Sequence, residues 1–312
     1  MNAYELSKSI LNRVRDKWRS LKYSNYSEVS ERVNFTTSLL ERQLNSNNSI
    51  HEVQVVMPFQ VLIVSSISDQ RFLPLNIRKL IEIYGESIST ITVLTPNIES
   101  EFVTRIRSFK PVVVEPEEIY IGETLRKTIQ KFKLDRRAWL TQQYLKSKFV
   151  YNATIPVLIL DADTFINRKI NWTSPGSKLL MINSTDFHYP YNLNYEIFSN
   201  QYAPLLNFVS HVQLQEPPIV RNMFGRDFEQ GWQTWLLSGY KKHESSPVSE
   251  YQSYGSYICN NFANEVNFFI PKHVLFFPSD VLDTSFEELL VSSSFDILTL
   301  GNKVGFPASL FE

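Results

Sequence analysis

Two aspartates one residue apart, Asp161 and Asp163, are the residues whose types and spacing most directly suggest chemistry. They follow the apolar run Val157 to Leu160, which Pro156 precedes. Such a run is typical of a buried parallel strand, and ligands of open α/β sheets bind at the carboxyl ends of these strands. Residues i and i+2 of an extended chain point to the same side, so both carboxylates could face one Mg²⁺ or Mn²⁺ ion. That metal would bridge the phosphates of a nucleotide diphosphate and neutralise this group as it leaves.

The acidic pair allows two other interpretations. Two aspartates in a surface turn would have no chemical role. The run from Asp161 to Thr164 also resembles the Asp-x-Asp-x-Thr loop of haloacid-dehalogenase-type phosphatases, which would make Asp161 a nucleophile and Asp163 an acid/base. Asp280 and Asp283 would then form the late acidic motif of that family. Against this interpretation, no glycine follows the second aspartate, and the loop lies in mid-chain instead of opening its domain.

Glu250 and His211 are the candidates for proton transfer. Glu250 follows Ser249, a suitable N-cap, and a carboxylate in the first turn of a helix tends to stay ionised. It is therefore the candidate base for the acceptor hydroxyl in an inverting sugar transfer, with a capping residue on a surface helix as the alternative. His211 interrupts an apolar strand, where it could bind metal or phosphate or be a hydrogen-bonded core histidine.

A polar stripe on one helix and an aspartate near the first strand suggest a nucleotide site. The helix predicted for residues 135–149 carries four side chains at the spacing i, i+3, i+4 and i+7, namely Trp139, Gln142, Gln143 and Lys146. They predict a wall that faces a ligand, with an ordinary partly exposed helix as the alternative. Asp69, just after the first predicted strand, suits a hydrogen bond to a nucleotide base or ribose, or else a turn cap.

The elements that would position these side chains alternate between strand and helix patterns. Predicted strands are 61–66, 91–96, 112–114, 157–160, 179–182, 207–213 and 274–277. Predicted helices are 28–44, 73–84, 135–149, 219–228, 233–240, the helix that begins near 250, and 286–292, whereas 190–200 is predicted as a loop. This order predicts an α/β fold whose mostly parallel sheet has helices on both faces. We expect a helical extension over 1–50 and one main domain over 51–312, with a nucleotide-binding half (58–165) and an acceptor half (166–312).

Composition narrows the class of protein. With 43% hydrophobic and 20% charged residues over 312 positions, the chain can bury a large core. A net charge of −1 gives no basic field, so we expect no nucleic-acid partner. Cys259 stands alone, which excludes an internal disulfide and favours a reducing, cytoplasmic location, as does the lack of a secretory signal or an apolar span. Residues 4–22 predict a basic amphipathic helix, either peripheral at the inner face of a membrane or packed on the main domain.

Taken in order, the motifs resemble a bacterial and viral group of GT-A-type glycosyltransferase-like proteins. The residues that carry the resemblance are Asp69, Trp139-x-x-Gln142-Gln143-x-x-Lys146, Asp161-Ala162-Asp163, Val209-Ser210-His211 and Ser249-Glu250-Tyr251-x-x-Tyr254-Gly255. The similarity covers residues 58–280. The chain departs from the group in Ser66-Ile67-Ser68 before Asp69 and in having only 9 glycines.

The resemblance implies a GT-A fold, a nucleotide-diphosphate sugar as donor, and Mn²⁺ or Mg²⁺ held by Asp161 and Asp163, with Asp163 the direct ligand. It implies that His211 and Glu250 line the acceptor side, and that the donor side is formed by Asp69, Arg137, Trp139, Gln143, Lys146 and Asp161. The expected activity is transfer of a sugar to a glycan or lipid-linked acceptor in surface polysaccharide synthesis. A phosphatase and a non-catalytic glycan-binding protein are the alternatives, and the oligomeric state is not indicated.

Overall fold

The computed structural model describes residues 26–46, 57–132, 136–174, 177–182, 188–238, 248–276 and 295–300. These residues belong to two compact units, which are described separately. Unit 1 lies within Met1–Val55, Thr173–Ser210 and Thr234–Ile270, and unit 2 within Val56–Trp172, His211–Gln233 and Pro271–Glu312. Among the described residues, no helix combines the length and the apolar character that a membrane crossing requires.

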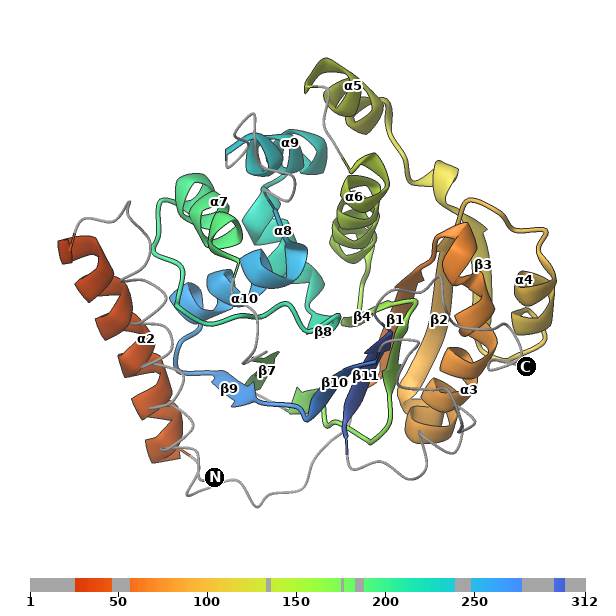
Figure 1. The fold of residues 1–312 in the computed structure, drawn as a ribbon, viewed down its shortest axis with the longest axis horizontal. Helices are drawn as coiled ribbons and strands as arrows, with labels where there is room; N and C mark the ends of the chain where they lie inside the picture. The colour runs from red at the N-terminus through yellow and green to blue at the C-terminus, as the bar shows by residue number, and fades with distance from the viewer. Residues whose placement is uncertain are drawn as a thin grey trace. The chain divides into compact units, whose positions relative to one another are not determined.

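The core of unit 2 is a five-stranded sheet with the order β3-β2-β1-β4-β8 (Figure 1). Its strands are β1 (Phe59–Val64), β2 (Ile88–Thr95), β3 (Val112–Pro116), β4 (Val157–Asp161) and β8 (Val212–Gln215). The first four run parallel, and β8 pairs antiparallel with β4. The predicted α/β class with a mostly parallel sheet is therefore confirmed.

Helices cover this sheet on both faces. As a consequence, residues 61–64 of β1 and 157–160 of β4 are buried without a break. The helical elements of unit 2 are η1 (Ile67–Phe72), α3 (Leu73–Tyr84), η2 (Gly85–Ser87), α4 (Glu101–Ile106), η3 (Glu117–Ile119), α5 (Glu123–Phe132), α6 (Arg137–Asn152) and α8 (Pro217–Phe224). Helix α9 (Phe228–Ser238) continues from unit 2 into unit 1. Helix α3 packs against β2, and α6 packs against β1 and α8.

A second, three-stranded sheet of unit 2 has the order β10-β11-β5. Its strands are β10 (His273–Phe276), β11 (Ile297–Leu300) and β5 (Thr164–Ile166). Because β5 follows β4 after a turn of two residues, this sheet begins directly behind the acidic pair.

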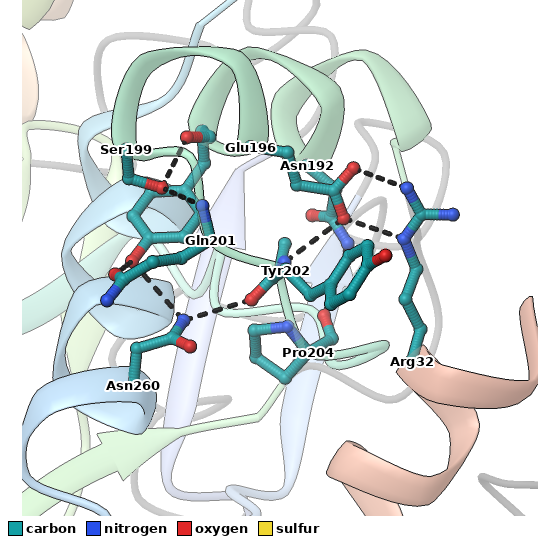
Figure 2. A network of polar contacts seen from close by, with 10 residues as sticks. Arg32, Asn192, Glu196, Ser199, Gln201, Tyr202, Pro204 and Asn260 are labelled. Carbon is teal, nitrogen blue, oxygen red and sulfur yellow. Dashed lines mark hydrogen bonds and ion pairs between the residues drawn. The ribbon is translucent and has the colours of Figure 1, made fainter. Parts of the chain in front are cut away.

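The described part of unit 1 combines helices with a small sheet, in addition to the end of α9. Its helices are α2 (Tyr26–Ser46), α7 (Tyr189–Ser199) and α10 (Glu250–Asn261), and its strands, in the order β6-β7-β9, are β6 (Thr173–Ser174), β7 (Ser177–Met181) and β9 (Val266–Phe269). Helix α7 packs against α10. Figure 2 shows how α2 is attached: the Arg32 guanidinium donates to both carboxylate oxygens of Glu196 on α7, at 2.7 and 2.6 Å.

Two of the predicted elements are wrong. Residues 190–200, expected as a loop, form α7, which has Pro190 in its first turn and ends at Asn200 in the left-handed conformation with φ 55°. Proline in the first turn and asparagine at the end are favourable helix boundaries. The strand expected over 207–213 starts only at Val212, because His211 also has a left-handed backbone, with φ 60°.

Other predictions are confirmed or stay predictions. The helix 73–84 has the predicted bounds, whereas the strand expected over 179–182 lies in the small sheet of unit 1 as β7. The helices predicted for 4–22 and 286–292 lie outside the described residues. The domain boundaries at residues 50 and 165 stay predictions.

Candidate functional site

The acidic pair lies at the carboxyl edge of the parallel sheet of unit 2. Asp161 is the last residue of β4 and is in register with Val64, the last residue of β1. Ala162 and Asp163 form a turn before β5. The extended spacing assumed from the sequence is therefore wrong, because the chain leaves the strand after Asp161. The carboxyl edge, where ligands of such sheets bind, is the predicted location.

Three contacts from elements remote in sequence hold this turn. Asn76 of α3 donates from Nδ2 to Thr164 O at 2.9 Å and to Ala162 O at 3.3 Å. The backbone N of Leu300 donates to Asp163 O at 3.0 Å. Buried Asn76 was not identified from the sequence, although a lone amide in the apolar stretch Leu73–Tyr84 is a usable signal. Because its main-chain oxygens are held, the turn has a defined shape.

The carboxylate of Asp161 is held between two cationic groups. Lys146 Nζ lies 2.5 Å from Oδ1, and His211 Nδ1 lies 2.9 Å from Oδ2. The backbone N of Asp161 also donates to His211 O at 3.0 Å, which extends the β4–β8 ladder by one residue. The Lys146 side chain is 3% exposed, whereas Asp161 is 23% and His211 35% exposed. His211 is therefore the member of this trio that offers most surface to a ligand.

The charges of the trio reinforce one another. Burial raises the pKa of Asp161, but the charge of Lys146 and the hydrogen bond from His211 outweigh it and hold this pKa below its usual range. Burial lowers the pKa of His211, yet the hydrogen bond to Asp161 and the charges of Asp161 and Asp163 outweigh it and raise the pKa above 6.5. An ionised carboxylate can only accept, so Nδ1 of His211 carries the proton of this hydrogen bond.

The polar stripe on α6 divides into a buried and a more exposed part. Gln143 and Lys146 are buried, whereas Trp139 is half-buried. Arg136, just before the helix, has a left-handed backbone and places its guanidinium 4.8 Å from the centre of the Trp139 ring. Arg137 is exposed. The structure thus uses the ammonium of Lys146 to bind Asp161, and presents Trp139 and Arg137 nearer the surface.

Asp69 lies in η1, shortly after β1, at the same edge of the sheet. Its Oδ2 accepts a hydrogen bond from Ser66 Oγ at 2.8 Å, which matches the turn-capping alternative. The next residue, Gln70, donates from Nε2 to Thr95 Oγ1 and Asn97 O, both at 2.6 Å. These bonds connect the segment that follows β1 to the end of β2 and to the residues just after it. Asp69 therefore lies in a segment that hydrogen bonds hold to the neighbouring strand end.

Glu250 belongs to unit 1. Ser249 is confirmed as the N-cap of α10, because its Oγ accepts from Gln252 N at 3.3 Å. Glu250 is buried, so the alternative of a cap on a surface helix is wrong. Tyr251, Tyr254 and Gly255 of the motif are buried too. Between them, buried Gln252 donates to Leu206 O at 2.9 Å and accepts from Phe208 N at 3.0 Å.

A divalent cation fits this edge only if water and substrate phosphates supply most of its ligands. Within the described ranges, no three His, Cys, Asp or Glu side chains converge on a common metal position. Mg²⁺ in particular is often held by one or two carboxylates, with water and substrate phosphates as its other ligands. Since Lys146 occupies Oδ1 of Asp161, the carboxylate of Asp163 is the better candidate for direct contact.

Comparisons with known proteins leave the family open. No protein-family model matches the chain, and no curated protein sequence is significantly similar to it. Two solved structures resemble it in fold: an active-site mutant of LgtC, with a TM-score of 0.48, and the galactosyltransferase LgtC in complex with donor and acceptor sugar analogues, with a TM-score of 0.43. Each is 14% identical over 81% of this chain and 94% of that chain. At these values neither likeness decides an activity.

Proposed function

We propose that the protein is a metal-dependent glycosyltransferase that moves a sugar from a nucleotide diphosphate to a glycan or lipid-linked acceptor, in surface polysaccharide synthesis. The observation that carries the proposal is the carboxyl edge of the parallel sheet, where Lys146 and His211 hold Asp161 and the turn with Asp163 follows. This edge concentrates positive groups and a carboxylate where a nucleotide diphosphate would bind.

Each residue of this edge has a proposed role. Asp163 would be the direct ligand of Mn²⁺ or Mg²⁺, which would supply charge neutralisation for the departing diphosphate. Asp161 would hold the His211 ring in place at this edge, and Lys146 would keep Asp161 ionised and in place. Asp69, Trp139 and the other donor-side candidates, Arg137 and Gln143, would approach the nucleotide.

Glu250 is the proposed general base of an inverting transfer. Its support is the sequence motif and its place in the first turn of α10, behind the Ser249 cap. Contact with a membrane through residues 4–22 stays a prediction.

The phosphatase alternative is weaker because of the contacts of Asp161. A nucleophilic carboxylate must present one oxygen to the phosphorus atom of its substrate. Here Oδ1 is in contact with the Lys146 ammonium and Oδ2 with the His211 ring. Both contacts withdraw electron density from the carboxylate, and this favours a positioning role over an attacking role.

The test is calorimetric titration of the protein with UDP and GDP, with and without Mn²⁺, followed by a panel of nucleotide sugars. We expect nucleotide binding that Mn²⁺ strengthens, and that Asp163→Ala removes this Mn²⁺ effect without unfolding the protein. Asp227→Asn is the matched control, since Asp227 is an exposed cap whose Oδ1 accepts from Gln230 N at 3.1 Å. The control should bind nucleotide as the wild type does.

Four results would contradict the proposal or a part of it. The absence of any nucleotide binding and turnover would refute the whole assignment, and sugar binding without nucleotide affinity would favour the glycan-binding alternative. Hydrolysis of a simple phosphate ester that depends on Asp161 would favour the phosphatase. An undiminished Mn²⁺ effect in Asp163→Ala would refute the metal ligand alone.

A further inference from the structure

One amide on helix α3 binds the chain on both sides of the residue proposed as the metal ligand. Asn76 is 0% exposed, within the buried first part of α3. Its Nδ2 donates to the carbonyl oxygens of Ala162 and Thr164, at 3.3 and 2.9 Å. These two residues are the chain neighbours of Asp163. The side chain of Asn76 therefore holds the main chain directly before and directly after Asp163.

The carbonyl oxygen of Asp163 itself is held as well. It accepts a hydrogen bond from Leu300 N at 3.0 Å. A peptide unit is planar, so a held carbonyl oxygen restrains the plane of its whole unit. Asn76 restrains the plane before Asp163, and Leu300 restrains the plane after it. Since the φ and ψ angles of Asp163 relate these two planes, both angles are set, and with them the direction of its Cα–Cβ bond.

Asparagine is not the residue that the fold alone favours at position 76. Its helix propensity is lower than that of leucine, and the other residues from Leu73 to Ile77 are apolar and buried. The Oδ1 atom of Asn76 is buried and accepts no hydrogen bond from any of the described residues. A buried polar atom without a partner is unfavourable and calls for an explanation. The restraint that Nδ2 places on the turn explains why an amide is present here.

We propose that Asn76 is a positioning residue for Asp163. Its effect on Mn²⁺ rests on the metal site proposed above. Ordering the backbone of one residue lowers an equilibrium constant by roughly 5- to 30-fold. Asn76 imposes this order before any ligand arrives, so an ion that binds to Asp163 does not have to impose it. Because α3 begins directly after η1, the same helix also connects the turn with Asp163 to the segment that carries Asp69.

The first test follows the turn itself and needs no ligand. We expect Asn76→Leu to accelerate hydrogen exchange of the Leu300 N–H by about 5-fold or more relative to the Ser65 N–H. Ser65 N donates to Leu94 O at 2.9 Å beside the main sheet, so the ratio of the two rates cancels a general loss of stability.

Asn194→Leu is the matched control for this substitution. Asn194 is also 0% exposed on a helix, α7 of unit 1, and its Nδ2 donates to the backbone oxygen of Trp235 at 2.6 Å. Its Oδ1 is likewise buried without a hydrogen-bond partner among the described residues. Asn194→Leu should therefore remove a similar buried amide and leave the ratio of the two exchange rates unchanged.

The second test measures Mn²⁺ binding in the presence of UDP, by the loss of the electron paramagnetic resonance signal of free Mn²⁺. We expect Asn76→Leu to raise the Kd for Mn²⁺ by about 5- to 30-fold and to leave the affinity for UDP without metal unchanged. A general loss of structure would weaken both. Asn194→Leu should change neither. If Asn76→Leu does not fold, Asn76→Ala takes its place, since it removes the same donor and adds no volume.

The two tests separate this inference from the proposed function. An unchanged ratio of exchange rates in a folded variant would overturn the positioning role. A changed ratio with an unchanged Kd for Mn²⁺ would overturn the effect on the ligand. A changed ratio in a protein whose wild type binds neither UDP nor Mn²⁺ would refute the proposed function and leave the positioning of Asp163 intact.

Discussion

Replacement of Lys146 by methionine is expected to destabilise the protein through the carboxylate it leaves behind. The Lys146 side chain is 3% exposed, and its ammonium lies 2.5 Å from Oδ1 of Asp161. Removal of one partner from a buried ion pair costs about 3–5 kcal/mol. Asp161 is 23% exposed and keeps His211 as a partner, so the expected loss is lower, about 2–3 kcal/mol. This corresponds to a decrease in melting temperature of about 5–10 °C.

The assay is thermal unfolding of Lys146→Met, Asp161→Asn and the double variant, followed by near-ultraviolet circular dichroism. Lys146→Met leaves the Asp161 carboxylate without its ammonium partner, and Asp161→Asn leaves the Lys146 ammonium without its carboxylate. The double variant has neither charge, so its loss in free energy of unfolding should be smaller than the sum of the two single losses by about 1–3 kcal/mol. Lys148→Met is the matched control on the same helix. Its ammonium lies 2.6 Å from Glu229 Oε1, but the two side chains are 23% and 28% exposed. The control should lose no more than about 1 kcal/mol.

Two results would refute this reasoning. The first is a decrease in melting temperature for Lys146→Met that is no greater than that of Lys148→Met. The second is additivity of the two single substitutions within about 0.5 kcal/mol, since residues without an interaction behave in this way. Either result would mean that Lys146 does not hold Asp161 in place, and the role proposed for Asp161 would lose its basis.

Three further predictions concern other parts of the chain. Arg32→Met should lower the free energy of unfolding by about 3 kcal/mol and expose α2 to limited proteolysis, because it leaves the Glu196 side chain, only 10% exposed, without its main partner; unchanged proteolysis would contradict this (Figure 2). Gly255→Ala should destabilise by about 1–3 kcal/mol despite the higher helix propensity of alanine, since its Cβ would lie 2.3 Å from Cδ2 of buried Phe208. Phe208→Ala removes Cγ and Cδ2, so Gly255→Ala should cost less in a Phe208→Ala background than in the wild type in urea unfolding, and an equal cost in both backgrounds would refute the clash. Tyr84→Phe should lose about 1–3 kcal/mol at pH 7, because two buried N–H groups lose their acceptor. Burial raises the pKa of Tyr84 to about 12 against these two hydrogen bonds, so between pH 10 and 12 the folded protein keeps a proton that the unfolded chain releases. The advantage of the wild type over Tyr84→Phe should therefore shrink as the pH rises above 10, and a constant difference would contradict the raised pKa.

The sequence predicted the central part of unit 2 well, because local pattern and burial agree there. The run Val157 to Leu160 is apolar, lies between strands and is buried on both faces, so propensity and tertiary environment favour the same structure. The helix from Leu73 to Tyr84 is of the same kind. The sequence does not predict helix α7, because Pro190 and the Tyr and Asn residues that follow it are typical of a loop. Proline in a first turn is nevertheless compatible with a helix.

The candidate site was predicted residue by residue but not as an arrangement. Asp161, His211 and Lys146 are each candidates from the sequence, but the sequence does not predict that Lys146 binds Asp161. The contact could not be predicted, because residues 15 and 50 positions away from Asp161 become neighbours only through the β4–β8 pairing and the packing of α6. Asn76 is a similar case, since the bonds it makes join α3 to a turn 86 residues later.

The backbone of His211 gives an argument for function that no motif contains. A left-handed residue outside glycine costs about 1 kcal/mol or more and persists only where the surroundings enforce it. Here it allows His211 to bind Asp161 twice, through its carbonyl oxygen to the backbone N and through Nδ1 to the carboxylate. An ion pair that only stabilised the fold would be complete with Lys146 and would not need a strained neighbour. Because strain of this kind concentrates at functional sites, the conformation of His211 favours a ligand at this edge independently of the Asp-x-Asp pattern.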